Sequence, residues 1–275
     1  MHEVVGESAK QNGGHITIEV QNAIGWLKFD NPDKHNALSQ RMWQDLPNYI
    51  EALNDDPKVR IIVMHGAGNK AFCAGADISE FGTVRKDAKS ARIYEDENVA
   101  AFDAISRCQK PVIAMIHGYC FGGGFGIAAA ADLRFADDGA IFSVPAAKLG
   151  LAYPVAAISN IIDAIGKQTT KEILFTGRRF TAAEMFDRGF LLKVCSVENL
   201  KPEVMSLAME ISENAPASIR AAKLTIDALN HNDSDSRENL LEFAHKVAAS
   251  TFESADYKEG REAFKQRRKP VFRGK

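Results

Sequence analysis

Residues 72–77 read FCAGAD and residues 111–124 read PVIAMIHGYCFGGG, and these two segments decide the fold. In each, an apolar, strand-like run ends in small residues, which leave backbone N–H groups bare and open to close approach. The second segment continues as FGIAAAAD, whose alanines favour a helix with the glycine triplet at its N-terminus. Free amides at such a helix end stabilise negative charge. An isolated triplet usually marks only a tight turn, but together the two segments favour an oxyanion site.

Both segments, in this order, resemble the crotonase superfamily, also called the enoyl-CoA hydratase/isomerase family. The resemblance runs from LKFDNP at 27–32 and NAL at 36–38 to FKQRRKPVF at 264–272, so it covers nearly the whole chain. It implies an α/β fold, a crotonase-like spiral of ββα units with a C-terminal helical trimerisation region. It also implies that the amides of Ala76 and Gly123 form an oxyanion hole for the thioester carbonyl of an acyl-CoA.

The chain departs from the hydratases of this family at the catalytic side chains. Hydratases carry one glutamate two residues after the triplet and another in a later segment, and here those positions are Gly126 and Ala146. Residues 142–154, FSVPAAKLGLAYP, contain no Asp or Glu, and Pro154 stands where related isomerases and dehalogenases have a carboxylate. Because a general acid or base typically contributes about 10²–10⁴-fold to rate, its absence indicates a changed reaction.

Two polar side chains remain in that segment, Tyr153 and Lys148. Methylmalonyl-CoA decarboxylases of the superfamily resemble this chain locally, with a tyrosine at the position of Tyr153 and no hydratase glutamates. Decarboxylation needs an oxyanion hole and a proton donor but no base, so we expect a decarboxylase or isomerase that uses Tyr153. The alternative is that Tyr153 only packs its ring and bonds a carbonyl. Lys148 is expected to be solvated.

Two other functions stay open. The charged segment 80–90, EFGTVRKDAKS, is expected to be a flexible loop that closes over the acyl group. Glu80 would then supply a relocated carboxylate for a genuine enoyl-CoA hydratase, although a solvated position on a short helix is the simpler expectation. The third candidate is a non-catalytic acyl-CoA binding protein.

The resemblance also implies where coenzyme A binds, as part of the substrate and without any permanently bound cofactor. It assigns the nucleotide, pantetheine and phosphate contacts to seven residues: Lys34, His35, Ala74, Ala76, Asp77, Ile78 and Arg267. Arg267 begins a basic run that would reach the phosphates, if necessary on a neighbouring subunit. Asp77 itself is expected to cap the turn that follows it. A homotrimer or dimer of trimers is implied.

Composition agrees with an enzyme of this kind. The chain has 275 residues, 45% of them hydrophobic and 25% charged, with a formal net charge of −2, which argues against a nucleic-acid surface. No window is long and apolar enough for a membrane span, and the N-terminus lacks a signal-peptide pattern, so a cytoplasmic location is expected. The four cysteines show no metal or redox spacing, so no metal site is expected. Cys73, beside the first glycine segment, is expected to be a small buried hydrophobe.

Apolar patterns divide the chain into three parts. We expect a flexible leader at 1–14, the spiral core at 15–200 and the C-terminal helical region at 201–275. The core begins with a hairpin of strands at 16–20 and 24–29, followed by a helix that Ser39 caps and Pro47 kinks or restarts. Further buried strands are expected at 61–64, 112–116 and 133–136. Helices are expected at 204–214, 217–230, 236–250 and 257–266.

Overall fold

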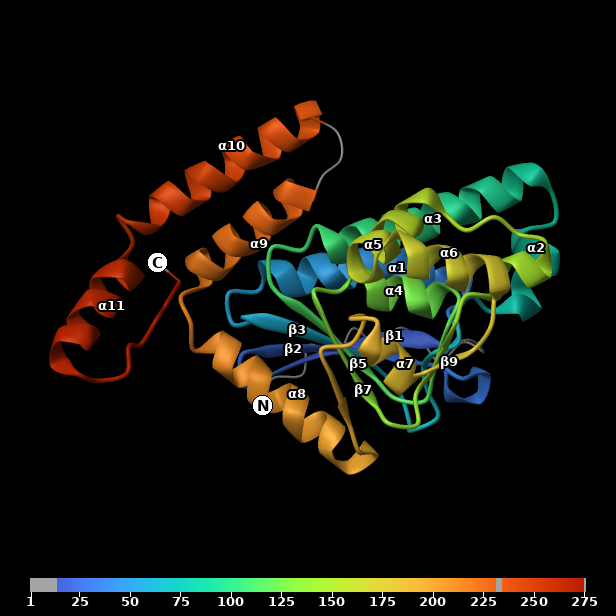
Figure 1. Ribbon diagram of the computed structural model, residues 1–275, viewed down its shortest axis with the longest axis horizontal. Coiled ribbons are helices and arrows are strands. Elements are labelled where there is room, and N and C mark those ends of the chain that lie inside the picture. The colour runs from blue at the N-terminus through green and yellow to red at the C-terminus, as the bar shows by residue number, and fades with distance from the viewer. Residues whose placement is uncertain (1–13, 231–233, 275) are drawn as a thin grey trace.

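A six-stranded sheet and a four-stranded sheet form the body of the protein in a computed structural model, which describes residues 14–230 and 234–274 (Figure 1). The larger sheet has the order β1 (His15–Gln21), β2 (Ile24–Asp30), β3 (Ile61–Gly66), β5 (Val112–Ile116), β7 (Leu133–Asp137) and β10 (Lys193–Cys195). The smaller sheet has the order β4 (Ala71–Cys73), β6 (Tyr119–Phe121), β8 (Ile141–Ser143) and β9 (Phe180–Thr181). Among the strand pairs of the described residues, β1–β2 and β8–β9 are antiparallel and the others are parallel.

From β3 to β8, successive strands alternate between the two sheets, and a helical segment follows each pair. β3 and β4 lead to η2 (Ile78–Glu80), α2 (Phe81–Val84) and α3 (Ala88–Ser106), whereas β5 and β6 lead to α4 (Gly123–Ala130). β7 and β8 lead to η3 (Pro145–Leu149), α5 (Val155–Ile165) and α6 (Lys167–Thr176). This repeat of two strands and a helical segment confirms the α/β spiral expected from the sequence.

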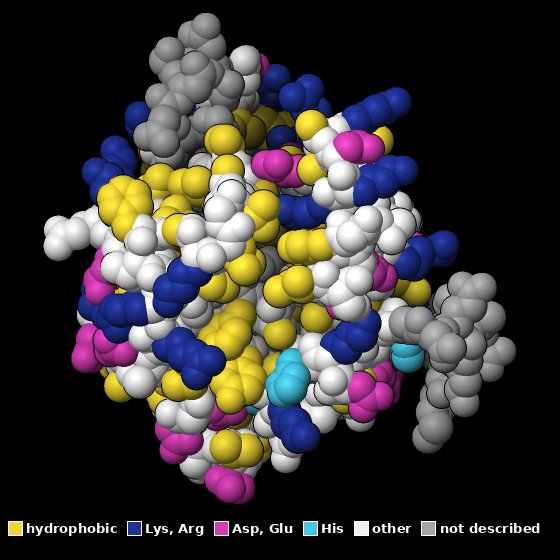
Figure 2. Space-filling view, turned by 90° about the vertical axis from the view of Figure 1, so that its right-hand side faces the viewer, with side chains coloured by type: hydrophobic (Ala, Val, Ile, Leu, Met, Phe, Trp, Pro, Cys, Tyr) yellow, Lys and Arg dark blue, Asp and Glu magenta, His cyan; other side chains and the backbone are white. Residues whose placement is uncertain are grey.

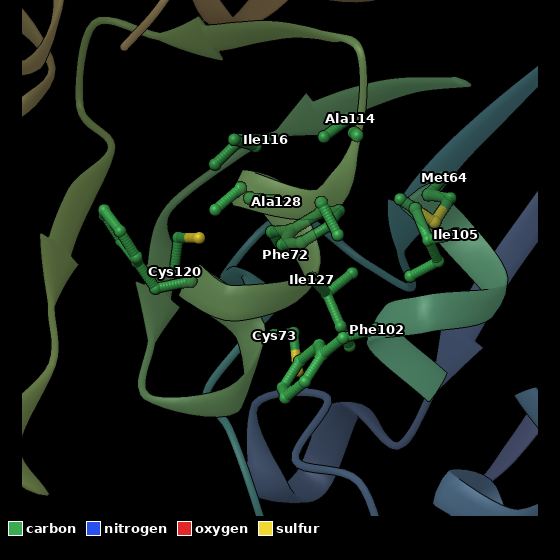
Figure 3. Close-up of a cluster of buried hydrophobic side chains, with 14 of the residues drawn as sticks. Met64, Phe72, Cys73, Phe102, Ile105, Ala114, Ile116, Cys120, Ile127 and Ala128 are labelled. Carbon is green, nitrogen blue, oxygen red and sulfur yellow. The ribbon is translucent and has the colours of Figure 1, made fainter. Parts of the chain in front are cut away.

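The central strands are buried on both faces because helices cover each side of the larger sheet. Side chains of alternate residues, such as Met64 and Ala114, enter the main core, part of which Figure 3 shows around Phe72 and Ile127. The intervening residues, such as Val63 and Ile113, pack against α8 (Val197–Ser212) on the opposite face. The domain boundary predicted at residue 200 therefore falls within a helix that packs on the sheet.

The N-terminal elements follow the expected pattern with one difference. The hairpin turns at Asn22 and Ala23, which both have positive φ, and the Ser39 hydroxyl accepts a hydrogen bond from the Met42 amide at the start of α1 (Gln40–Asp55). Pro47 neither ends nor restarts α1, which continues through it as one helix. The predicted leader at 1–14 lies outside the described residues except for Gly14.

In the described residues after β10, four helices follow, close to the expected ranges. Beyond α8 these are α9 (Pro216–Asn230), α10 (Ser234–Thr251) and α11 (Ala255–Gln266). Figure 1 shows α10 and α11 projecting from the body of the protein, with α11 at the opposite end from α2. The segment after α11 folds back on it, since the Asp256 carboxylate accepts hydrogen bonds from the Arg273 and Gly274 amides.

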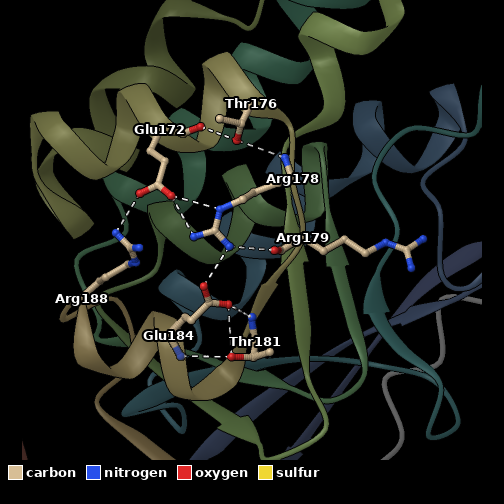
Figure 4. A network of polar contacts seen from close by, with 7 residues as sticks. All are labelled: Glu172, Thr176, Arg178, Arg179, Thr181, Glu184 and Arg188. Atoms are coloured by element: carbon tan, nitrogen blue, oxygen red, sulfur yellow. Dashed lines mark hydrogen bonds and ion pairs between the residues drawn. The ribbon is translucent and has the colours of Figure 1, made fainter.

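An ion-pair network fixes the connection between α6 and α7 (Ala182–Asp187) (Figure 4). Arg178 pairs with Glu172 and Glu184, at 2.8 Å in each case, and its guanidinium lies 3.6 Å from the centre of the Phe180 ring. The carbonyl of the preceding Gly177 accepts a hydrogen bond of 3.3 Å from the Ser143 hydroxyl. The Ser143 carbonyl in turn accepts a hydrogen bond of 2.8 Å from the Gly122 amide. Hydrogen bonds through Ser143 therefore connect this segment to the glycine triplet.

Candidate active site

The two glycine segments meet backbone to backbone at the ends of β4 and β6. A Cβ built at Gly75, which has φ of +96°, would lie 2.9 Å from the Phe121 carbonyl oxygen and 3.1 Å from the Gly123 nitrogen. A Cβ at Gly124 would lie 2.2 Å from the Cys73 carbonyl oxygen. Only residues without a side chain allow this approach, which explains why both segments need glycine there.

Two free amides face this junction, those of Ala76 and Gly123. The neighbouring amides are occupied, since Leu38 N–H donates to the Gly75 carbonyl and Asp77 N–H to the Leu38 carbonyl, each at 2.8 Å. In the described chain, neither Ala76 N–H nor Gly123 N–H has a hydrogen-bond acceptor. Gly123 is the first residue of α4, so its amide also lies at the positive end of that helix. Two such donors can hold a developing oxyanion.

Beside this junction, Tyr153 and Phe102 occupy the space above Gly126. A Cβ at Gly126 would lie 2.7 Å from the Tyr153 hydroxyl oxygen and 2.8 Å from Phe102 Cε1. The Tyr153 hydroxyl donates a hydrogen bond of 2.8 Å to the carbonyl of Gly122, the residue before Gly123. No glutamate fits at position 126 unless these two rings move. The sequence showed that the glutamate was missing but not that a phenol occupies its space.

The environment of Tyr153 keeps its hydroxyl protonated. Burial raises the pKa of Tyr153 well above its ordinary value, and the hydrogen bond from the Gly126 amide opposes this only in part. Both uses of Tyr153 that the sequence left open are therefore compatible with the fold, because it bonds a carbonyl and lies beside the free amides. Ala146 packs partly buried on the core, and the Lys148 side chain lies along Gly177.

The segment 80–90 is not the flexible loop that its charge pattern indicated. Residues 78–84 form η2 and α2, and α3 begins at Ala88, where the Asp87 carboxylate accepts a hydrogen bond from the Ser90 amide. Glu80 lies on this short helical segment, and its carboxylate accepts a hydrogen bond of 2.7 Å from the Gln40 amide. It thus caps the start of α1, as helix N-termini require.

Six of the seven residues assigned to coenzyme A gather at one edge of the junction. Lys34 Nζ lies 2.5 Å from Asp77 Oδ2 and 2.8 Å from Ser79 Oγ, and Asp77 Oδ1 accepts a hydrogen bond from the Ser79 amide. Asp77 therefore caps η2, as expected. Burial alone would raise the pKa of Asp77, but the hydrogen bonds from Lys34 and Ser79 outweigh it and lower that pKa.

The backbone joins the other members of this group to the same edge. The His35 carbonyl accepts a hydrogen bond of 3.0 Å from the Ala74 amide, and the His35 ring lies 5.8 Å from that of Tyr119. Ile78 is 61% exposed. Arg267 lies apart, because it ends α11 at the far end of the molecule from α2 (Figure 1). Within one chain it does not join the other six.

Cys73 and Cys120 pair across β4 and β6 directly beneath the glycine segments. Both side chains are 0% exposed, and burial raises the pKa of Cys73 to about 12. A thiol of this kind is not a nucleophile at neutral pH. Cys73 is the buried small residue that the sequence analysis expected.

A buried polar group beside the junction was missed from the sequence. Trp43 of α1 touches Gly123, since a Cβ there would lie 2.7 Å from Trp43 Cζ2. Behind Trp43 stand Tyr94 and Asn98 of α3, which are 0% and 5% exposed. The signal available in the sequence is their spacing, because Tyr94, Asn98 and Phe102 recur every four residues and share one helix face.

The face of the molecule that carries α2 has a distinctive surface. Figure 2 shows a strip of hydrophobic side chains down the middle of this face, with Lys and Arg side chains on both sides. No described helix is both long and apolar enough to cross a bilayer. In the part of the chain that the structure describes, His, Cys, Asp and Glu nowhere gather into a group that could hold a metal ion.

Comparisons with known proteins identify the family. The Enoyl-CoA hydratase/isomerase family model matches residues 19–275. The crotonyl-CoA hydratase of Syntrophomonas wolfei is 30% identical over 258 residues, which cover 94% of this chain and 97% of that protein. The mitochondrial enoyl-CoA hydratase of Pongo abelii is 31% identical over 252 residues, covering 92% and 84%. A solved structure of an enoyl-CoA hydratase/carnithine racemase from Magnetospirillum magneticum superposes with a TM-score of 0.85 at 31% identity, covering 94% and 96%. The chain belongs to the enoyl-CoA hydratase/isomerase family of lyases and isomerases.

Proposed function

We propose that this enzyme stabilises the enolate of an acyl-CoA thioester between the amides of Ala76 and Gly123, and that Tyr153 replaces the hydratase glutamates. The reaction that fits best is decarboxylation. The observation that carries this proposal is the Tyr153 hydroxyl, which fills the space above Gly126 beside the two free amides.

The protonation state of Tyr153 favours decarboxylation over isomerisation and hydration. Isomerisation requires a base that removes a proton from carbon, and a phenol whose pKa is raised stays neutral and donates. In decarboxylation the bond from the α-carbon to the carboxyl group breaks, its electron pair moves into the thioester enolate, and carbon dioxide leaves. The α-carbon then takes a proton, which Tyr153 delivers and recovers from solvent. Hydration through Glu80 is disfavoured because that carboxylate caps α1.

The same proposal covers substrate binding and assembly. Lys34, His35, Ala74, Asp77 and Ile78 would bind the nucleotide and pantetheine at the edge where Lys34 contacts Asp77 and Ser79. Arg267 would reach the phosphates only from a neighbouring subunit, in a homotrimer or dimer of trimers. Exposed apolar side chains support an interface on the C-terminal helices, including Ile226 at 59%, Phe243 at 45% and Phe264 at 87% exposed.

The first test compares two substrates in the unmodified enzyme and in two variants. Purified enzyme is given methylmalonyl-CoA, with thioester products separated by chromatography, and crotonyl-CoA, with loss of the enoyl-thioester absorbance followed. We expect decarboxylation without hydration. For Tyr153→Phe the decarboxylation rate should fall by about 10²-fold or more, while binding of coenzyme A is unchanged. Tyr49→Phe on α1 is the matched control and should keep the full rate.

Gly123→Pro tests the oxyanion hole separately, since it removes the amide donor. Gly123→Ala is its control, because a Cβ at this position meets Trp43 in both variants while the alanine keeps the N–H. Losing one donor should lower the rate of the proline variant about 10²–10³-fold below that of the alanine variant. Fast hydration of crotonyl-CoA would instead indicate a hydratase, and tight binding of both esters without turnover would indicate a non-catalytic binding protein.

A further inference from the structure

The side chain of Asn36 is buried, and its polar atoms are hydrogen-bonded to the main chain. Asn36 is 1% exposed. Its Nδ2 atom donates to the carbonyls of Ala67 at 2.9 Å and Ala71 at 2.7 Å, and its Oδ1 atom accepts a hydrogen bond of 3.1 Å from the Asn31 amide. Because both side-chain hydrogens already have acceptors, this carboxamide has no donor left for a ligand. It joins the segment before α1 to the connection between β3 and β4.

The backbone at Asn36 has a conformation that residues with a side chain rarely adopt. His35 and Asn36 follow one another with φ of +53° and +56°. The other non-glycine residues of the described chain with positive φ lie in the β1–β2 turn, at Asn22 and Ala23, and at the end of α11, at Arg267. Such a conformation persists when surrounding contacts fix it, and asparagine tolerates it better than most residues. The three hydrogen bonds of the Asn36 side chain supply those contacts.

The segment that Asn36 fixes determines the direction of one of the two free amides. Leu38, two residues further along, forms a parallel bridge with Ala76 and hydrogen-bonds to the residues on either side of it, Gly75 and Asp77. In a parallel pair, a residue whose two neighbours bond to the facing strand has its own N–H directed away from that strand. The Ala76 amide is therefore left free, and its direction depends on where Leu38 lies.

We propose that Asn36 is a positioning residue for the oxyanion hole, because its carboxamide fixes the segment that orients the Ala76 amide. The proposal rests on the proposed function for the position of the thioester carbonyl between Ala76 and Gly123, and it holds whichever reaction follows. In this role Asn36 makes no contact with the substrate and acts through Leu38. Catalytic geometry is sensitive to such support, since a displacement of about 1 Å can lower a rate by about 10²-fold.

The experiment measures how strongly the bound thioester carbonyl is polarised. Butanoyl-CoA labelled with ¹³C at the thioester carbonyl is bound to the full-length protein, and isotope-edited infrared spectroscopy gives the carbonyl stretching frequency. This ester has neither a free carboxylate nor a double bond, so none of the candidate reactions consumes it. Hydrogen bonds lower the frequency, and we expect the bound band below that of the free ester. Asn36→Gly, which removes the carboxamide and suits a positive φ, should return the band part of the way toward the free-ester frequency.

Two comparisons give the scale of this shift and exclude a general loss of stability. Gly123→Pro, read against Gly123→Ala, shows the shift that loss of one amide donor produces. Asn54→Ala is the matched control, because the Asn54 carboxamide also accepts a hydrogen bond from a main-chain amide, that of Gln109 at 3.0 Å, at the other end of α1. This control should lower the melting temperature and leave the band unchanged. With the thioester that the enzyme turns over, Asn36→Gly should lower kcat about 10-fold or more and change KM by a smaller factor.

The outcomes separate this proposal from the proposed function. If Asn36→Gly leaves the band in place, or if Asn54→Ala moves it as far, Asn36 does not position the amide and the proposal is wrong. If butanoyl-CoA does not bind to the unmodified protein, or binds with the frequency of the free ester, the proposed function fails as well. Should Asn36→Gly not fold, Asn31→Ala takes its place, because it removes the hydrogen bond of 2.7 Å from Asn31 Nδ2 to the Ala37 carbonyl of the same segment. It must move the band in the same direction, and an unmoved band overturns the proposal.

Discussion

The two sides of the α4 N-terminus differ in which groups they expose, main-chain amides on one side and side chains on the other. On one side, the glycine segments bring two free amides together, and every group that acts there belongs to the main chain. On the other side, above Gly126, the space is filled by the side chains of Tyr153 and Phe102. Under the proposed function, the first side stabilises the enolate, whereas the second decides which reaction follows. In that case the main-chain amides provide what the family has in common, and the side chains beside Gly126 determine the reaction.

The largest effect should come from adding a side chain where the two glycine segments meet. Gly124→Ala puts a Cβ 2.2 Å from the Cys73 carbonyl oxygen, so the two segments must separate. We expect the free energy of unfolding to fall by about 3 kcal/mol and the activity to be lost. Chemical denaturation measures the first and a thioester assay the second. Gly82→Ala, where a Cβ has no neighbour within 4 Å, is the control, and equal stability of the two variants would contradict the close approach.

A smaller effect should follow from adding a methyl group at Gly126, beside the Tyr153 and Phe102 rings. Gly126→Ala meets both Tyr153 and Phe102, so we expect a loss of about 1–3 kcal/mol. Because removing the Tyr153 hydroxyl relieves one of the two contacts, Gly126→Ala combined with Tyr153→Phe should lose less than the sum of the single changes. A double-mutant cycle by denaturation measures this coupling. Strict additivity would mean that Tyr153 does not occupy this space.

The glycine segments and the strands around them were predictable because their patterns are local. The buried strands at 61–64, 112–116 and 133–136, the hairpin, and the Ser39 cap all appeared where the sequence indicated them. Residues 80–90 were misjudged, because their charge obscured the Asp87 cap and the stacking of Arg85 on Phe81 and Tyr94. The Tyr153–Gly126 contact joins residues far apart in the sequence, so no local pattern reports it.

The pH dependence of the rate distinguishes a phenol from a carboxylate as the group that transfers the proton. A neutral Tyr153 is the active form, and its pKa lies above the ordinary value of 10, so the decarboxylation rate should not fall on the alkaline side up to about pH 10. A carboxylate acting as base would instead lose activity as it becomes protonated at acidic pH. The measurement is the pH profile of kcat, checked against the thermal stability at each pH. A loss of rate near neutral pH would rule out Tyr153 as the only titrating donor.

The smallest effect should come from the edge that carries Lys34. Lys34→Met removes a half-exposed ion pair with Asp77 and, under the proposed function, a contact to coenzyme A. We expect stability to change by less than about 1 kcal/mol, while KM rises several-fold and kcat stays constant. Steady-state kinetics with Lys58→Met, which removes an exposed charge elsewhere, provides the comparison. A fall in kcat would show that Lys34 affects the chemical step.

The free amides of Ala76 and Gly123 have a consequence for how such an enzyme changes over generations. A main-chain N–H survives every substitution of its own residue except proline, so random mutation seldom removes these donors directly. The side chains across α4 carry no such protection and can be exchanged one codon at a time. Under the proposed function, a lineage can therefore lose one reaction and acquire another while the two amides that hold the enolate are retained.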